Sequence, residues 1–230
     1  MINVQENILI NERLKKAYED ATPEMLKIWS EIYNQKPPFR MNEFGIIDVE
    51  KYDTDNGILF IGRETNGWND EDYEKGYLFR DWMCDISRNG LSGRGHITKH
   101  PNMWYNIGRW AMLLSEPSYP IIYFADAKAE AISEIGKIAF TNVNKVRGGN
   151  VSGDEYFRFS EEPFVKNLLR TEIEIINPKI IVCCGTARPA FPFPDNFTGE
   201  FYVMPHPAAG KRKADMLVDL NKQRRKNKIR

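Results

Sequence analysis

Two short segments of this chain place a residue with acid–base chemistry directly after an apolar run. Glu64 follows the run at 58–61, and His206 follows the run at 201–204. A carboxylate and an imidazole can each transfer a proton or stabilise charge in a reaction. In an open parallel sheet, ligands bind outside the carboxyl ends of the strands. If both runs are strands of one such sheet, these two residues point towards a single crevice.

The rest of the chain alternates between strand-like runs and segments with helical periodicity. Further apolar runs at 138–143 and 179–184 complete a set of four predicted strands. The segment 160–176 has an apolar face and predicts an amphipathic helix that ends at Asn177-Pro178. Other helices are predicted at 77–86, 103–114 and 127–135. Strands separated by helices form parallel sheets, so we expect an α/β protein of three layers (α/β/α) around a four-stranded parallel sheet.

Three regions lie outside this pattern. Residues 7–34 predict N-terminal helices with a break near Thr22 and Pro23, where a cap and a first-turn proline would fit. Within 86–125, the stretch 89–100 is rich in Gly, Ser and basic residues and is typical of a loop. Residues 211–230 form a basic segment. A chain of 230 residues favours one domain spanning 1–230, with two small domains as the alternative.

The composition limits the partners and cofactors. Lys and Arg total 32, as do Asp and Glu, but 211–230 holds nine basic residues and two Asp. Such a run is either a solvated helix face or a surface for phosphates. The three cysteines show no spacing of a zinc site or a disulfide framework, and no stretch has the pattern of a signal peptide or a membrane span. We expect a cytoplasmic, monomeric protein with no cofactor, no metal and no membrane partner.

Several short blocks occur in an informative order. Gly62-Arg63-Glu64-Thr65-Asn66 follows the first strand, and then come Phe79 and Thr141-Asn142-Val143-Asn144-Lys145. The strand block 177–185 and His206-Pro207 close the series, which spans about 150 residues. In this order the blocks resemble the uracil-DNA glycosylase superfamily. The most similar branch is the bacterial and archaeal one whose members usually carry an iron–sulfur cluster.

The resemblance implies a role for each residue. Glu64 would stabilise positive charge on the deoxyribose and orient a water, and His206 would donate a hydrogen bond to the departing uracil. Asn142 would pair with the N3–H and O4 edge of uracil, which cytosine presents in the reversed sense. Phe79 would stack on the flipped base. Substrate contacts would also come from Gly62, Arg63 and Asn66, and DNA phosphate contacts from Lys211, Arg212 and Lys213.

Each role has a structural alternative. Glu64 could be a solvated loop acid, His206 could hold a turn, Asn142 could end a strand, and Phe79 could be a core residue. The chain also departs from the family pattern. It has three cysteines, whereas cluster binding takes four thiolates, so no iron–sulfur cluster is expected. Thr65 stands where the family has Pro, and no Ser follows His206-Pro207. Relative to the compact members of the family, residues from about 86 to 125 are an insertion, for which we expect either an extra helical layer or a lid.

The sequence therefore predicts a uracil-DNA glycosylase-like enzyme that hydrolyses the N-glycosidic bond of a flipped deoxyuridine or a related damaged base in DNA. Two alternatives stay open. One is a non-catalytic protein on the same fold that binds nucleic acid or nucleotides, and the other is a hydrolase of small N-glycosides.

Overall fold

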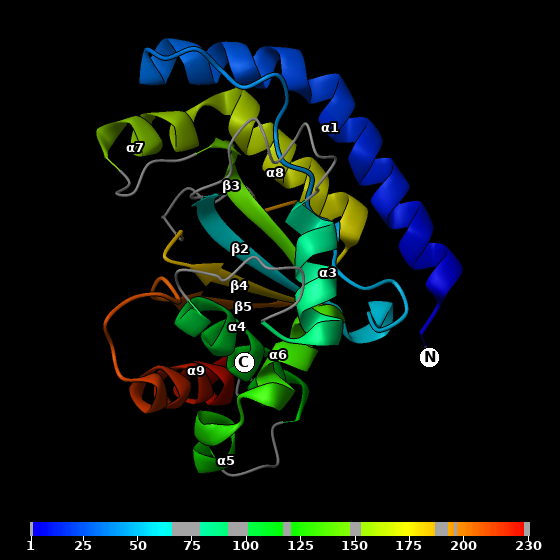
Figure 1. Cartoon of the computed structure of the whole chain (residues 1–230), viewed down its shortest axis with the longest axis vertical. Coiled ribbons are helices and arrows are strands. Elements are labelled where there is room, and N and C mark those ends of the chain that lie inside the picture. The colour runs from blue at the N-terminus through cyan, green and yellow to red at the C-terminus, as the bar shows by residue number, and fades with distance from the viewer. Residues whose placement is uncertain are drawn as a thin grey trace.

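Helices cover both faces of a central sheet, so the molecule has three layers (Figure 1). The computed structural model describes residues 2–65, 79–91, 101–116, 121–147, 153–186, 193–195 and 197–227. The predicted α/β class is confirmed.

The central sheet is mixed. Its strands are β1 (Gly45–Ile46), β2 (Ile58–Thr65), β3 (Ala139–Arg147), β4 (Ile180–Cys184) and β5 (Glu200–Met204). Their order is β1-β3-β2-β4-β5, and all neighbours are parallel except β1, which is antiparallel to β3. The sheet is thus five-stranded rather than four-stranded and purely parallel. The sequence could not reveal β1, because two residues are too few to show a strand period.

β2 lies at the centre of the sheet. Its residues 58–61 are all buried, as expected for a continuous apolar run covered on both faces. From β2 the chain crosses to β3 on one side and then to β4 on the other side. A strand order that reverses in this way opens a crevice at the carboxyl ends of the two central strands. The last residues of β2 and the two residues after β4, Gly185 and Thr186, therefore lie at the edge where a ligand would bind.

One face of the sheet is covered by α1 (Val4–Tyr33), α7 (Asp154–Glu161) and α8 (Pro163–Ile176) (Figure 1). The predicted break near Pro23 is wrong, because α1 continues through this residue. Apolar residues of α1 are buried both before and after it, and this packing outweighs the loss of one helical hydrogen bond at proline. Thr22 Oγ1 donates to the carbonyl of the preceding turn instead of capping a second helix.

The predicted helix 160–176 is divided into two. α7 ends before Glu162, which is extended, and Pro163 then begins α8. Proline suits the first helical position because no intrahelical N–H is needed there. The predicted end of the helix is confirmed, since Asn177 adopts a left-handed conformation that terminates α8.

The other face is covered by helices from three parts of the chain (Figure 1). They are α3 (Phe79–Asn89), α4 (Pro101–Ser115), α5 (Ile121–Asp126), α6 (Ala129–Glu134) and α9 (Lys213–Asn227), with short 3₁₀ turns η1 (Thr54–Asn56) and η3 (Ile135–Lys137). α4 lies in the predicted insertion, and its Trp104, Ile107 and Trp110 are buried in the core. The described part of the insertion therefore adds helical packing to the core.

α9 covers the outer edge of β5. Val203 N–H donates to Gln223 Oε1 at 3.0 Å, and Gln223 Nε2 donates to the Val203 carbonyl at 2.8 Å. Asn227 Nδ2 donates to the Phe201 carbonyl at 3.2 Å. On its other face α9 buries Met216, Leu217 and Leu220. Most of the basic segment is thus an integral helix of the fold.

Candidate functional site

Several predicted site residues lie on or just after parallel strands that run to one edge of the sheet: Gly62, Arg63 and Glu64 on β2, Asn142 on β3, and His206 after β5. Thr186 Oγ1, just after β4, donates to the Ile61 carbonyl at 3.1 Å and joins the ends of the two central strands. Neighbouring strands lie about 4.8 Å apart, so three spacings from β3 to β5 amount to roughly 14 Å. A flat base lying over β2 and β4 would therefore have β3 at one side and the turn after β5 at the other.

Gly62 and Asn142 are in direct contact. They are register partners on β2 and β3, and a Cβ atom on Gly62 would lie 2.2 Å from Asn142 Oδ1. Any larger residue at 62 would displace the amide, so the glycine makes room for it. Asn142 is only 3% exposed, which is typical of an amide whose polar atoms are fixed by their surroundings.

Phe79 lies beside this pair within a cluster of aromatic rings. Its ring centroid is 5.9 Å from that of Phe140, and Phe140 Cζ would be 3.0 Å from the same added Cβ at Gly62. The ring also packs against Phe44, Trp82 and Trp104, and Phe79 is 6% exposed. This position agrees with the structural alternative of a core residue that shapes the site from behind.

Glu64 and Arg63 have different surroundings. Glu64 accepts a long hydrogen bond of 3.5 Å from Asn144 Nδ2, which also donates to Tyr33 Oη at 3.2 Å. Burial, and next the Glu64 charge, raise the pKa of Tyr33. The Arg63 guanidinium instead lies over the Tyr156 ring at 4.8 Å, against α7. Asn66 lies outside the described residues.

The His206 ring is held in a tight turn. Ala209 N–H donates to the His206 carbonyl at 2.8 Å, and Ala208 N–H donates to Nδ1 at 3.2 Å. Because Nδ1 accepts this bond, the neutral ring carries its proton on Nε2. Gly185 has a φ of +73°, and a Cβ there would lie 3.1 to 3.4 Å from His206 atoms. The turn thus packs closely on the end of β4.

α4 anchors this turn through residues that the sequence analysis missed. Asn106 Nδ2 donates to the Pro207 carbonyl at 2.7 Å, and Arg109 Nη1 donates to Asn106 Oδ1 at 3.3 Å. Both residues are buried, and burial lowers the pKa of Arg109. The sequence signal was a polar pair three residues apart within an otherwise apolar helical stretch, a spacing that places both on one face.

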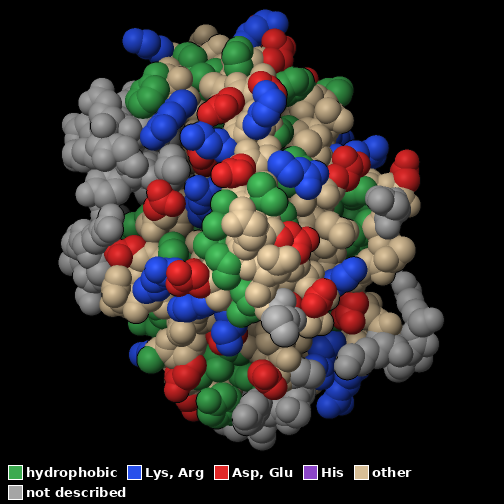
Figure 2. All heavy atoms as spheres, turned by 90° about the vertical axis from the view of Figure 1, so that its right-hand side faces the viewer, with side chains coloured by type: hydrophobic (Ala, Val, Ile, Leu, Met, Phe, Trp, Pro, Cys, Tyr) green, Lys and Arg blue, Asp and Glu red, His purple; other side chains and the backbone are tan. Residues whose placement is uncertain are grey.

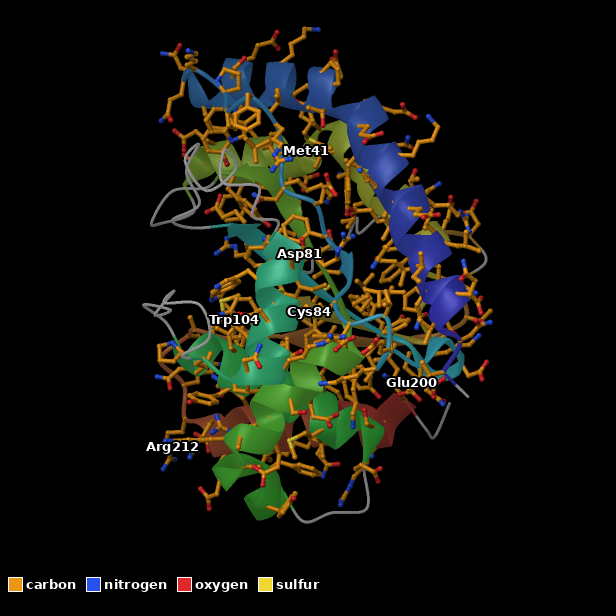
Figure 3. All side chains as sticks on the ribbon, turned by 45° about the vertical axis from the view of Figure 1, so that its right-hand side comes forward. Met41, Asp81, Cys84, Trp104, Glu200 and Arg212 are labelled. Carbon is orange, nitrogen blue, oxygen red and sulfur yellow. The ribbon has the colours of Figure 1, made fainter. Side chains whose placement is uncertain are left out.

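The basic residues after the turn are exposed and partly paired with acids. Arg212 Nε lies 3.1 Å from Asp215, and Lys213 Nζ lies 3.5 Å from Asp126. Arg212 and Glu200, the first residue of β5, lie on opposite sides of the lower half of the molecule, with Arg212 on the side to which β5 runs (Figure 3). Lys211 is exposed as well. These side chains are at the correct end of the sheet for a ligand that extends beyond the crevice.

Cys183 and Cys184 are poor nucleophiles in this fold. Both are fully buried, and burial raises the pKa of Cys183 to about 12 and also raises that of Cys184.

Within the described residues, no cluster of three or more His, Cys, Asp or Glu could hold a metal ion. None of the described helices is long and apolar enough to cross a membrane.

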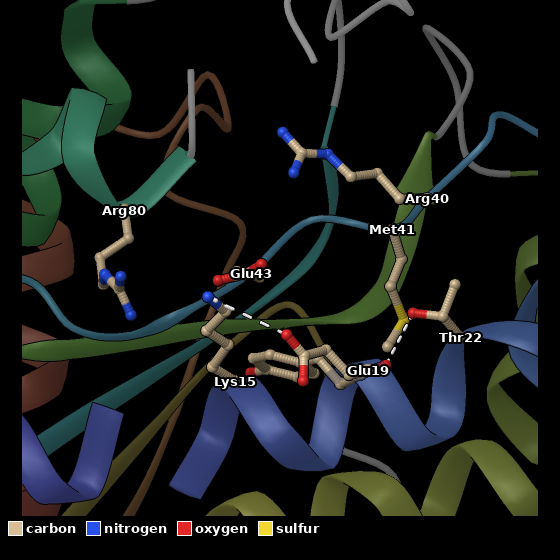
Figure 4. A pocket seen from close by; sticks show the side chains of 8 residues that line it. Lys15, Glu19, Thr22, Arg40, Met41, Glu43 and Arg80 are labelled. Atoms are coloured by element: carbon tan, nitrogen blue, oxygen red, sulfur yellow. Dashed lines mark hydrogen bonds and ion pairs between the residues drawn. The ribbon is translucent and has the colours of Figure 1, made fainter. Parts of the chain in front are cut away.

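A cavity of about 570 Å³ lies on another part of the molecule, between α1, the segment before β1 and the start of α3 (Figure 4). It is lined by Lys15, Tyr18, Glu19, Thr22, Arg40, Met41, Glu43 and Arg80. Acidic and basic side chains share this lining, and Lys15 pairs with Glu19 at 3.9 Å. Figure 2 shows the same mixture of charges across the face that contains α1. This face offers no single sign of charge to a polyanion.

A scan of the chain against protein-family models gives no match, and a search of curated proteins gives none either.

Proposed function

We propose that this protein is a uracil-DNA glycosylase-like enzyme that hydrolyses the N-glycosidic bond of a flipped deoxyuridine or related damaged base. The observation that carries the proposal is the contact between Gly62 and the Asn142 amide at the carboxyl end of the central strands. In the proposal this amide reads the base, because a side-chain amide offers both donors and an acceptor. The strand-order reversal between β2 and β4 supports a ligand site at the same edge.

The chemistry follows from the charges that develop in the reaction. The bond between C1′ and the base nitrogen breaks, the sugar becomes positive, and the base leaves with the electron pair. A water then forms the new C1′–O bond and releases a proton. The Glu64 carboxylate stabilises the sugar cation and orients this water, which are electrostatic and general-base roles.

His206 acts on the leaving group. Its Nδ1 accepts from the Ala208 N–H, so the proton of the neutral ring lies on Nε2, which is the donor in this proposal. A neutral imidazole in this tautomer donates to a carbonyl oxygen of the base as negative charge accumulates there. Because the turn is anchored to α4 and packed on Gly185, this donor is held in place before the substrate arrives.

A hydrolase of small N-glycosides is the second candidate, and the charge pairing of the basic segment favours it. Arg212 and Lys213 already lie near acids, which lowers the positive charge offered to a DNA backbone. A free nucleoside needs no phosphate contacts, so this pairing would not weaken its binding.

The test is an excision assay on oligonucleotides that carry uracil, hypoxanthine or xanthine, single-stranded and double-stranded, followed by alkaline cleavage of abasic sites. Free deoxyuridine is assayed in parallel for release of uracil. Strand cleavage at the uracil position supports the glycosylase, and release of uracil from the free nucleoside alone supports the second candidate. Binding with no product of either kind would contradict both and support a non-catalytic protein.

A further inference from the structure

A fully buried ion pair lies on the opposite face of β3 from the Asn142 side chain. Lys145 Nζ, on β3, is 2.9 Å from Glu172 Oε2 on α8, and both side chains are 0% exposed. The Tyr18 hydroxyl of α1 donates to Glu172, and Thr141 Oγ1 lies 3.2 and 3.3 Å from its two oxygens. The carboxylate of α8 is thus surrounded by donors from two other elements of the fold, α1 and β3.

This arrangement is costly. Burial raises the pKa of Glu172 and lowers that of Lys145, as expected when charged groups lose their water. Replacing a buried ion pair with apolar residues of similar volume is often neutral or stabilising. Apolar residues here would pack between β3 and α8 as well. Stability alone therefore does not explain the pair.

Of the hydrogen bonds that apolar residues could not reproduce, one reaches the candidate site. Lys145 Nζ donates to the Asn142 main-chain carbonyl at 2.6 Å. The regular pairing of β2 with β3 is interrupted just beyond this point, between Glu64 and Thr65. Asn142 itself keeps its regular register with Gly62, and the ammonium group adds a side-chain restraint on its carbonyl. A restrained carbonyl limits the ψ angle of residue 142, and the backbone dihedrals limit the rotamers that its side chain adopts.

We propose that Lys145 and Glu172 are positioning residues that set the direction of the Asn142 amide and, through it, the choice of base. The proposal rests on the base-reading role of Asn142 proposed above. Glu172 holds the Lys145 ammonium, Lys145 holds the Asn142 carbonyl, and the amide on the other face of the strand is aligned over Gly62. Neither positioning residue touches the substrate.

The test uses the double variant Lys145→Met with Glu172→Leu, which removes both charges together and leaves no buried charge unpaired. The matched control is Lys166→Met with Glu161→Leu, the same change in an ion pair that is partly exposed to solvent. We expect the first variant to lower the ratio of uracil to cytosine excision by about 10-fold or more, the scale of one misplaced contact, and the control to leave it unchanged. In an Asn142→Ala background the first variant should lower the ratio no further.

A second readout does not require activity. The side-chain amide signals of Asn142, assigned in NMR spectra by their loss in Asn142→Ala, should shift in the Lys145/Glu172 variant and stay in place in the control. If the wild-type protein excises no base, the proposed function fails and these signals alone decide the positioning role. Unmoved signals, or an unchanged base ratio in an active and folded variant, would overturn the proposal. Urea unfolding of each variant verifies that it is folded.

Discussion

The two ends of the candidate site are held in place by different kinds of structure. At one end, Asn142 lies within a strand, where register with Gly62 and the carbonyl contact from Lys145 fix its position. At the other end, His206 lies in a turn that follows β5, and its position depends on side-chain and turn hydrogen bonds. The first arrangement is set by the sheet and the helix layer of α1 and α8. The second is set by α4, in the opposite layer.

This difference predicts which substitutions each end of the site tolerates. A strand position is supported by many backbone hydrogen bonds, so a local substitution displaces little unless it enters the same space. The turn after β5 has two hydrogen bonds of its own, and its one described side-chain bond to α4 is the Asn106 amide. The Asn142 end should therefore respond most to steric changes and to loss of the Lys145 contact, and the His206 end should respond most to loss of the Asn106 hydrogen bond.

The largest effect should come from removing the two groups that are proposed to act in the reaction, the Glu64 carboxylate and the His206 imidazole. We expect Glu64→Gln, which keeps shape but not charge, and His206→Ala, which removes the Nε2 donor, each to slow uracil excision by roughly 10²–10³-fold. Single-turnover excision from a uracil-containing oligonucleotide measures both. DNA binding should survive, because phosphate contacts dominate affinity. Excision that is indifferent to both changes would place the chemistry elsewhere.

A steric change at the Asn142 end should come next. We expect Gly62→Ala to slow excision by about 10²-fold, because the new methyl group would displace the Asn142 amide. Loss of one such hydrogen-bonding group from an active site typically slows a reaction by this factor. Asn142→Ala should have a similar effect, and the two together should not add. The matched control is Gly210→Ala, since a Cβ there meets no atom within 4 Å. Full activity in Gly62→Ala would show that the amide does not read the base.

A lost hydrogen bond at the His206 end should cost stability first and rate second. Asn106→Leu leaves the Pro207 carbonyl without its donor, which should lower the free energy of unfolding by about 1–3 kcal/mol. Urea denaturation measures this loss, and Asn102→Leu, at an exposed position of the same helix, is the control. Asn106→Leu should slow excision less than His206→Ala does. Added to His206→Ala, it should slow excision no further. A further decrease there would mean that Asn106 acts by another route.

The smallest effect should be on the salt dependence of DNA binding. Lys211→Ala with Arg212→Ala should flatten the slope of log K against log salt by about 1.8, the amount for two phosphate contacts. Lys15→Ala with Lys16→Ala, which removes two cations from α1, is the matched control. Titrations at several salt concentrations compare the two. Equal slopes in both variants and the wild type would favour the small-nucleoside alternative.

The sequence predicted the parts of the fold that depend on local pattern. The continuous apolar run before Glu64 and the amphipathic residues before Asn177 correspond to β2 and α8. The break at Pro23 was wrong because packing on both sides of the proline maintains α1. In that case a tertiary contact outweighed a local preference, which no single-segment pattern can show.

The candidate site divides in the same way. Gly62 and Asn142 could be assigned to the same edge of the sheet, because each lies at the end of an apolar run, but their pairing in register is seen only in the structure. Asn106 could not be connected to Pro207, since 101 residues separate them and one hydrogen bond joins them. Phe79 was expected to stack on a base, and in the structure it is 6% exposed and lies among other aromatic rings. The sequence does not separate these two positions, because an aromatic residue is equally typical of a core and of a pocket wall.

The bonds between Gln223 and Val203 have a consequence for handling the protein. With one amide, Gln223 makes both of the hydrogen bonds that a residue of a sixth strand would make with β5. An unprotected outer strand is a template for the addition of a strand from another chain. A chain shortened after Leu220 would therefore lose this protection together with its cations, and we expect it to self-associate through β5. Charge at this end of the molecule is better removed by point substitution than by truncation.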